Sequence, residues 1–157
     1  MRMEAYLILK WLHLVGAATL FGVGVGTAFH FLVAARGGNV GVIAGAAHAM
    51  VLADFIFILP AGILQPATGV AMALLSGQPL HATWIVASAL LYVLVLACWV
   101  PVIFIQLRLR RIARRCAADG TPLGADYARL FRTWFILGWP AFLAMLGIFG
   151  LMVARPA

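Results

Sequence analysis

Residues 6–35 read YLILKWLHLVGAATLFGVGVGTAFHFLVAA, and this stretch decides the fold class. It holds a single charged side chain, Lys10, and it exceeds the about 20 apolar residues that a helix needs to cross a bilayer. It is also far longer than the apolar core of a cleavable signal peptide, which spans roughly 7–15 residues. We therefore expect a membrane-spanning helix over about residues 6–35.

Three more apolar stretches follow, at about residues 48–75, 83–107 and 134–153. The chain of 157 residues is 66% hydrophobic and 10% charged, whereas soluble domains average about 45–50% and about 25%. The sequence therefore predicts one all-α integral membrane domain over residues 1–157, a four-helix transmembrane bundle. Asn39 is expected to N-cap the run 40–47 that leads into the second helix.

The positive charges are distributed unevenly along the chain. Eight of the eleven Lys and Arg residues flank the first and third connections, and the other three, Arg2, Lys10 and Arg155, lie on the opposite side of the predicted membrane. The eight are Arg36, Arg108, Arg110, Arg111, Arg114, Arg115, Arg129 and Arg132. The positive-inside rule then predicts a basic cytoplasmic loop over 108–133, with both termini outside a bacterial inner membrane. Anionic lipid headgroups, rather than nucleic acid, explain the net charge of +7.

Two proline-containing helices suggest an internal repeat. Pro60-Ala61 and Pro140-Ala141 each precede an apolar run that contains glycine, and both helices are expected to run outward. One interpretation is a pair of parallel hairpin repeats. The other is that each proline is tolerated for its own local reason, as is common in membrane helices.

Ionisable residues within membrane segments are energetically costly, so each is a functional candidate. His13 has two interpretations: an axial ligand to haem iron in the bundle, or a hydrogen bond to a neighbouring helix. Lys10, one turn away, would either neutralise a haem propionate or extend to water. His30 lies about 25 Å further along the helix, so one haem cannot use both histidines. His30 with His48 would form a second haem site, or both would contact headgroups.

Asp54 is the one acidic residue well inside an apolar segment. We expect it to pair with His30, Arg108 or Arg132, either to fix helix packing or to handle protons. Gln65 precedes Pro66, which frees a backbone carbonyl that needs a partner. Asp54, Gln65 and Arg132 are therefore predicted as buried polar groups.

Four short stretches carry a resemblance to a known family. The chain resembles an uncharacterised bacterial integral-membrane family, domain of unknown function 2269, over nearly its whole length. The stretches are Lys10-Trp11-Leu12-His13, Leu52-Ala53-Asp54-Phe55, Gln65-Pro66-Ala67-Thr68-Gly69 and Leu151-Met152-Val153-Ala154-Arg155-Pro156. This resemblance implies four membrane helices and no particular activity.

A more distant resemblance is to the HemJ-type protoporphyrinogen oxidases and the CopD-like membrane domains. The matching positions are Lys10 and His13 in a Lys-x-x-His pattern, His30, Leu59-Pro60-Ala61, Pro140 and Arg155-Pro156. The resemblance implies b-type haem bound through His13. HemJ-type enzymes carry a functional lysine at the start of the third helix, but residues 83–88 here contain none. Porphyrinogen oxidation is therefore not implied.

Three functional hypotheses follow. The first is a haem b-binding protein of electron transfer or oxidoreduction, with His13 as iron ligand and Met72, Met145 or His81 opposite it. The second is a non-catalytic subunit or assembly factor, in a homo-oligomer or larger membrane complex, whose Gly22-x-x-x-Gly26 motif packs on a partner. The third is CopD-like metal transport, against which the scattered methionines argue.

Overall fold

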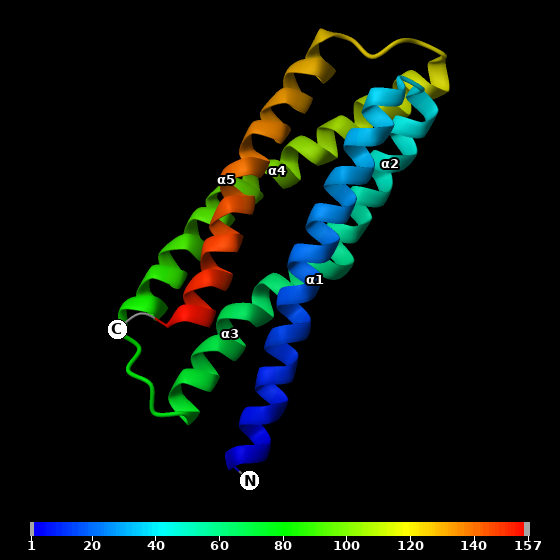
Figure 1. Cartoon of the computed structure of the whole chain (residues 1–157). Coiled ribbons are helices and arrows are strands. Elements are labelled where there is room, and N and C mark those ends of the chain that lie inside the picture. The colour runs from blue at the N-terminus through cyan, green and yellow to red at the C-terminus, as the bar shows by residue number, and fades with distance from the viewer. Residues whose placement is uncertain (1, 156–157) are drawn as a thin grey trace.

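The computed structural model describes residues 2–155, which are helical apart from short connections (Figure 1). The elements are α1 (Arg2–Gly37), α2 (Val40–Ala53), the π-helix η1 (Asp54–Ile58), α3 (Leu59–Leu75), α4 (Thr83–Asp119) and α5 (Ala125–Ala154). Four helical stretches, 3–37, 40–75, 83–119 and 125–154, are long and apolar enough to cross a membrane. The predicted all-α fold with four spans is confirmed.

The second span is α2, η1 and α3 in one continuous helix, and its π-turn has a cause in the sequence. The Leu59 N–H donates to the carbonyl of Asp54, five residues back rather than four. Pro60 has no N–H, and its ring crowds the carbonyl of Ile56. The helix therefore widens by one residue just before the proline. Such π-turns within α-helices are frequent at functional sites, and Asp54 opens this one.

Turns at the helix ends agree in part with the expectations. The Asn39 side chain accepts a hydrogen bond from the Val42 N–H at 3.2 Å, which confirms the predicted N-cap. The connection predicted over 108–133 is wrong in its extent, because only residues 120–124 separate α4 from α5. Leu, Arg and Ala are strong helix formers, so both helices continue beyond their apolar parts. Gly120, at φ 64°, then ends α4 in a left-handed conformation.

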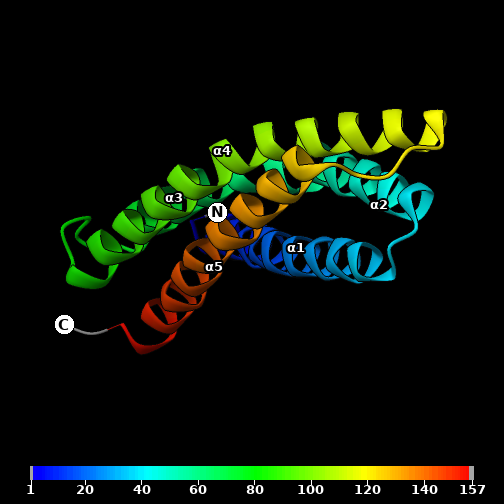
Figure 2. The same ribbon diagram turned by 90° about the horizontal axis from the view of Figure 1, so that it is seen from above.

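The helices pack as two groups that meet along α2 and α4. Figures 1 and 2 show α1 alongside α2 and α3, and α5 crossing α4 at an angle; α4 also packs on α2. The turns after α1 and α4 lie together at the top of Figure 1, and the helix ends beside them carry the clustered arginines, so we call this the basic end. The N-terminus, the α3–α4 turn and the end of α5 lie at the opposite, terminal end.

The densest packing lies at the basic end. Phe31, Leu109 and Ala113 are fully buried there, together with the small side chains Ala44, Ala46 and Ala47 of α2. Small residues let helix backbones approach closely, which is the main source of helix association in lipid. Phe31 of α1 meets Trp134 of α5 edge-to-face, with ring centroids 5.1 Å apart. This basic-end core holds all four spans together.

Ala113→Leu should destabilise the protein, because the added methyl groups have no room in the basic-end core. Overpacking of this kind costs about 1–3 kcal/mol. Ala117→Leu changes an exposed position one turn later, near the end of α4, and should change the unfolding free energy by no more than about 0.5 kcal/mol. Unfolding of both variants in mixed micelles, followed by circular dichroism, checks this. An equal decrease in unfolding free energy in the two variants would show that the basic-end core does not limit stability.

Candidate functional site

His13 is buried between α1 and α3 and forms a hydrogen bond with a threonine. Its Nδ1 lies 2.8 Å from Oγ1 of Thr68. The Thr68 hydroxyl has one hydrogen, and its 2.7 Å bond to the Leu64 carbonyl uses that hydrogen. With that hydrogen on the Leu64 carbonyl, we assign His13 Nδ1 as the donor to Thr68, which leaves the lone pair on Nε2. No described residue forms a hydrogen bond with Nε2.

A second bond ties α3 to the same turn of α1. The amide of Gln65 donates to the carbonyl of His13 at 2.9 Å, and the Gln65 side chain is buried as predicted. Gly16 makes this approach feasible, because a Cβ atom at that position would lie 2.4 Å from Nε2 of Gln65. His13 is thus held through both its backbone and its ring.

The carbonyl that Pro66 leaves without a helical partner belongs to Gly62. It accepts a hydrogen bond from the hydroxyl of Tyr92 on α4. The sequence predicted that a freed carbonyl would need a partner. Gln65 instead reaches across to α1, and a tyrosine from another span satisfies the carbonyl.

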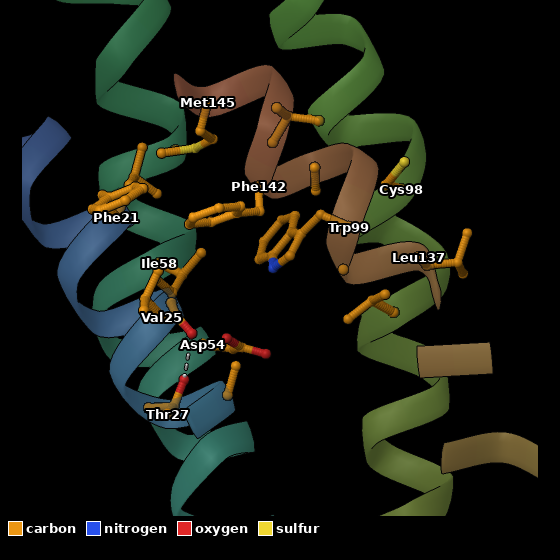
Figure 3. Close-up of a pocket in the computed structure, with 18 of the residues that line it drawn as sticks. Phe21, Val25, Thr27, Asp54, Ile58, Cys98, Trp99, Leu137, Phe142 and Met145 are labelled. Carbon is orange, nitrogen blue, oxygen red and sulfur yellow. Dashed lines mark hydrogen bonds between the residues drawn. The ribbon is translucent and has the colours of Figure 1, made fainter. Parts of the chain in front are cut away.

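A cavity of about 220 Å³ lies between the two groups of helices, towards the middle of the membrane segments (Figure 3). Its wall is mostly apolar and comes from α1, α2, η1, α3, α4 and α5. In Figure 3, Phe142 and Trp99 project into the space between α1 and α4, and Asp54 faces the same space from η1. Phe21 stacks on Phe142 at 5.7 Å and joins α1 to α5 beside the cavity.

Asp54 is buried as predicted, with 5% of its surface exposed, but its expected partners are elsewhere. His30, Arg108 and Arg132 are all exposed, so the prediction that Arg132 is a buried group beside Asp54 is wrong. The polar neighbour of the carboxyl is Gln106 on α4. The charge pattern pointed to an ion pair, but Arg132 lies on the side of α5 that faces outward.

The other candidate residues are dispersed. Lys10, His48 and His81 are exposed, and Met72 is half-buried on α3, one turn beyond Thr68. Met145 lines the cavity, whereas His13, Lys10 and Met72 do not. Within residues 2–155, no group of three or more His, Cys, Asp or Glu side chains could hold a metal ion.

These observations describe a multi-pass membrane protein with a tethered histidine and a separate intramembrane cavity. The family model described as "Predicted integral membrane protein (DUF2269)" matches residues 7–156. The chain belongs to this family. The match confirms the resemblance seen in the sequence over nearly the whole chain. None of the curated proteins and none of the solved structures matches it.

Three polar residues of these sites were not singled out from the sequence: Thr68, Tyr92 and Gln106. Thr68 has a local signal, since it lies three residues after the predicted Gln65. Tyr92 and Gln106 lie on α4 in apolar surroundings, and their importance depends on which helices α4 faces. That information is absent from residue spacing along one helix.

Tyr92→Phe should lower the unfolding free energy by about 0.5–1.5 kcal/mol, because the Gly62 carbonyl loses its partner. Pro66→Ala restores an N–H at position 66, which can donate to that carbonyl. In the Pro66→Ala variant, Tyr92→Phe should therefore change the unfolding free energy only slightly. A double-mutant cycle by micelle unfolding measures the coupling.

Tyr127→Phe is the matched control, because the Tyr127 hydroxyl is buried and has no partner among the described residues. Its removal should leave stability unchanged or raise it. If Tyr92→Phe lowered the unfolding free energy equally in the wild type and in Pro66→Ala, the Tyr92 hydroxyl would not be compensating for the hydrogen bond that Pro66 removes.

Proposed function

We propose that this protein binds haem b through His13 and acts in electron transfer or as a membrane oxidoreductase. The bond between His13 Nδ1 and Thr68 is the observation that carries this proposal. Histidines that bind metals usually donate their other ring N–H to a nearby acceptor, which fixes the tautomer and the ring orientation. His13 has this arrangement, with Nε2 as the nitrogen free to bind iron.

The surroundings of His13 fit a ligand role in several respects. The imidazole is buried, its ring is held by Thr68, and its backbone is held by Gln65. Gly69 adds no side chain beside it, since a Cβ there would lie 3.5 Å from Cε1 of His13. Lys10, one turn nearer the terminal end and exposed, supplies a positive charge for a propionate. Haem in such a site supplies one-electron transfer.

The site at His13 is distinct from the intramembrane cavity. His13 does not line the cavity, so the proposal concerns the terminal ends of α1 and α3. Of the two methionines considered as second ligands, Met72 shares that region through its place one turn beyond Thr68. Met145 belongs to the cavity wall instead. The eight basic residues near the basic end support a location in the bacterial inner membrane with that end in the cytoplasm.

Purified wild-type protein from haem-replete cells should show a Soret band and a reduced-minus-oxidised b-type spectrum. His13→Ala should abolish both, and Thr68→Val should weaken haem affinity about 10–100-fold, because it removes the acceptor that orients the ring. His30→Ala, an exposed histidine on the same helix, is the control and should retain the spectrum. A wild-type protein without haem, or an unchanged spectrum in His13→Ala, would overturn the proposal.

A second candidate function, a subunit of a larger membrane assembly, has its own observation. Gly22 and Gly26 are exposed one turn apart on α1, and a Cβ at either position would meet nothing within 4 Å. A face of this kind lets another membrane helix approach closely.

Gly22→Leu and Gly26→Leu should then abolish copurification with that partner while leaving the isolated chain folded. Gly45→Leu is the control, because Gly45 is equally open but lies on α2. Affinity purification from native membranes, followed by native electrophoresis, is the measurement. Retention of the assembly in both α1 variants excludes this face as the contact.

A further inference from the structure

Two buried oxygen atoms in the cavity wall lack hydrogen-bond partners among the described residues. They are Oδ2 of Asp54 and Oε1 of Gln106, and each residue is 5% exposed. Both residues line the cavity, Asp54 from η1 and Gln106 from α4. The amide oxygen of Gln106 can only accept a hydrogen bond, and the Asp54 carboxyl oxygen can only accept one when the group is ionised.

Leaving such groups unpaired is costly. A buried acceptor without a donor loses about 1–3 kcal/mol, and a charged one loses more. No lysine, arginine or histidine among residues 3–155 pairs with Asp54, and the expected partners His30, Arg108 and Arg132 are exposed. A molecule that donates hydrogen bonds to both oxygens would remove this cost.

The rest of the cavity selects for an apolar body. Phe21, Val25, Ile58, Trp99, Phe142 and Met145 line it, and Figure 3 shows these side chains around the space above Asp54. Val25 and Leu96 also lie on the outer surface, with 41% and 37% exposed, so the cavity reaches the surface that faces lipid. An apolar cavity of about 150 Å³ already holds benzene, so about 220 Å³ admits a head group with its first carbons.

We propose that this cavity binds a membrane-dissolved apolar molecule whose hydroxyl or ammonium group donates hydrogen bonds to Asp54 and Gln106. The ligand enters from the bilayer, its head reaches the π-turn, and its tail stays in contact with lipid. The site is independent of His13, which does not line the cavity. The competing account is that Asp54 is protonated and its hydroxyl donates a hydrogen bond to Oε1 of Gln106. This account requires no ligand.

The test uses three photoreactive probes with the same long alkyl tail: an alcohol, the matching amine and the matching methyl ether. Each is cross-linked to the purified protein in phosphatidylcholine vesicles, and the labelled peptides are mapped by mass spectrometry. The alcohol or the amine should label α4 near Trp99 and α5 near Phe142 saturably, with competition by unlabelled compound. The methyl ether, which cannot donate, should bind about tenfold more weakly. The relative labelling by alcohol and amine identifies the head group.

Asp54→Leu and Gln106→Leu should each weaken the donor probes about tenfold and leave the methyl ether unchanged. Ser88→Ala is the control, because Ser88 is also buried with an unpartnered hydroxyl but does not line the cavity. Ala141→Phe adds a large side chain to the cavity wall and leaves both acceptor residues in place, and it should block saturable labelling even if the polar variants fail to fold. Equal labelling by all three probes, or unchanged saturable labelling in folded Ala141→Phe, would overturn the proposal and favour the hydrogen bond between protonated Asp54 and Gln106.

Discussion

The close approach of α2 to its neighbours at the basic end is the contact on which the rest of the structure depends. Ala44, Ala46 and Ala47 have small side chains, and they form one buried cluster with Phe31 of α1 and Leu109 of α4. In lipid there is little hydrophobic gain from bringing helices together, and packing of this kind supplies the attraction. Beyond this core, towards the middle of the spans, residues of all four spans enclose the cavity.

Two prolines in the second span each remove a backbone hydrogen bond, and the structure compensates for each in a different way. Pro60 is absorbed within the helix, which widens into the π-turn and brings Asp54 to the cavity wall. The hydrogen bond that Pro66 removes is replaced by one between helices, because the Tyr92 hydroxyl donates to the carbonyl that Pro66 frees. In a bilayer no water can replace these bonds, so each one dictates a neighbour. The same reasoning makes the unpartnered oxygens of Asp54 and Gln106 informative, since they line the cavity, whereas the other two buried unpartnered atoms among the described residues, the hydroxyls of Ser88 and Tyr127, do not.

The two candidate sites differ in what the chain supplies. At His13 the protein provides a complete support for one ring nitrogen, through Thr68 at the ring and Gln65 at the backbone. In the cavity it provides acceptors without donors, within an apolar wall open to lipid. The first arrangement suits a bound metal centre and the second a lipid-soluble molecule. Neither site depends on the other, because His13 does not line the cavity.

The amino-acid sequence by itself determined the four spans, the all-α class, the Asn39 cap and the burial of His13, Asp54 and Gln65. These follow from local rules: the apolar length that crosses a bilayer, the capping chemistry of one side chain, and the cost of a polar group in lipid. Only the tertiary structure decided the partners. It placed Thr68 on His13, Tyr92 on Gly62 and Gln106 beside Asp54, and it left Arg132 facing outward. The physical reason is that such pairings depend on how each helix is rotated against its neighbours, and packing along the whole span sets that rotation.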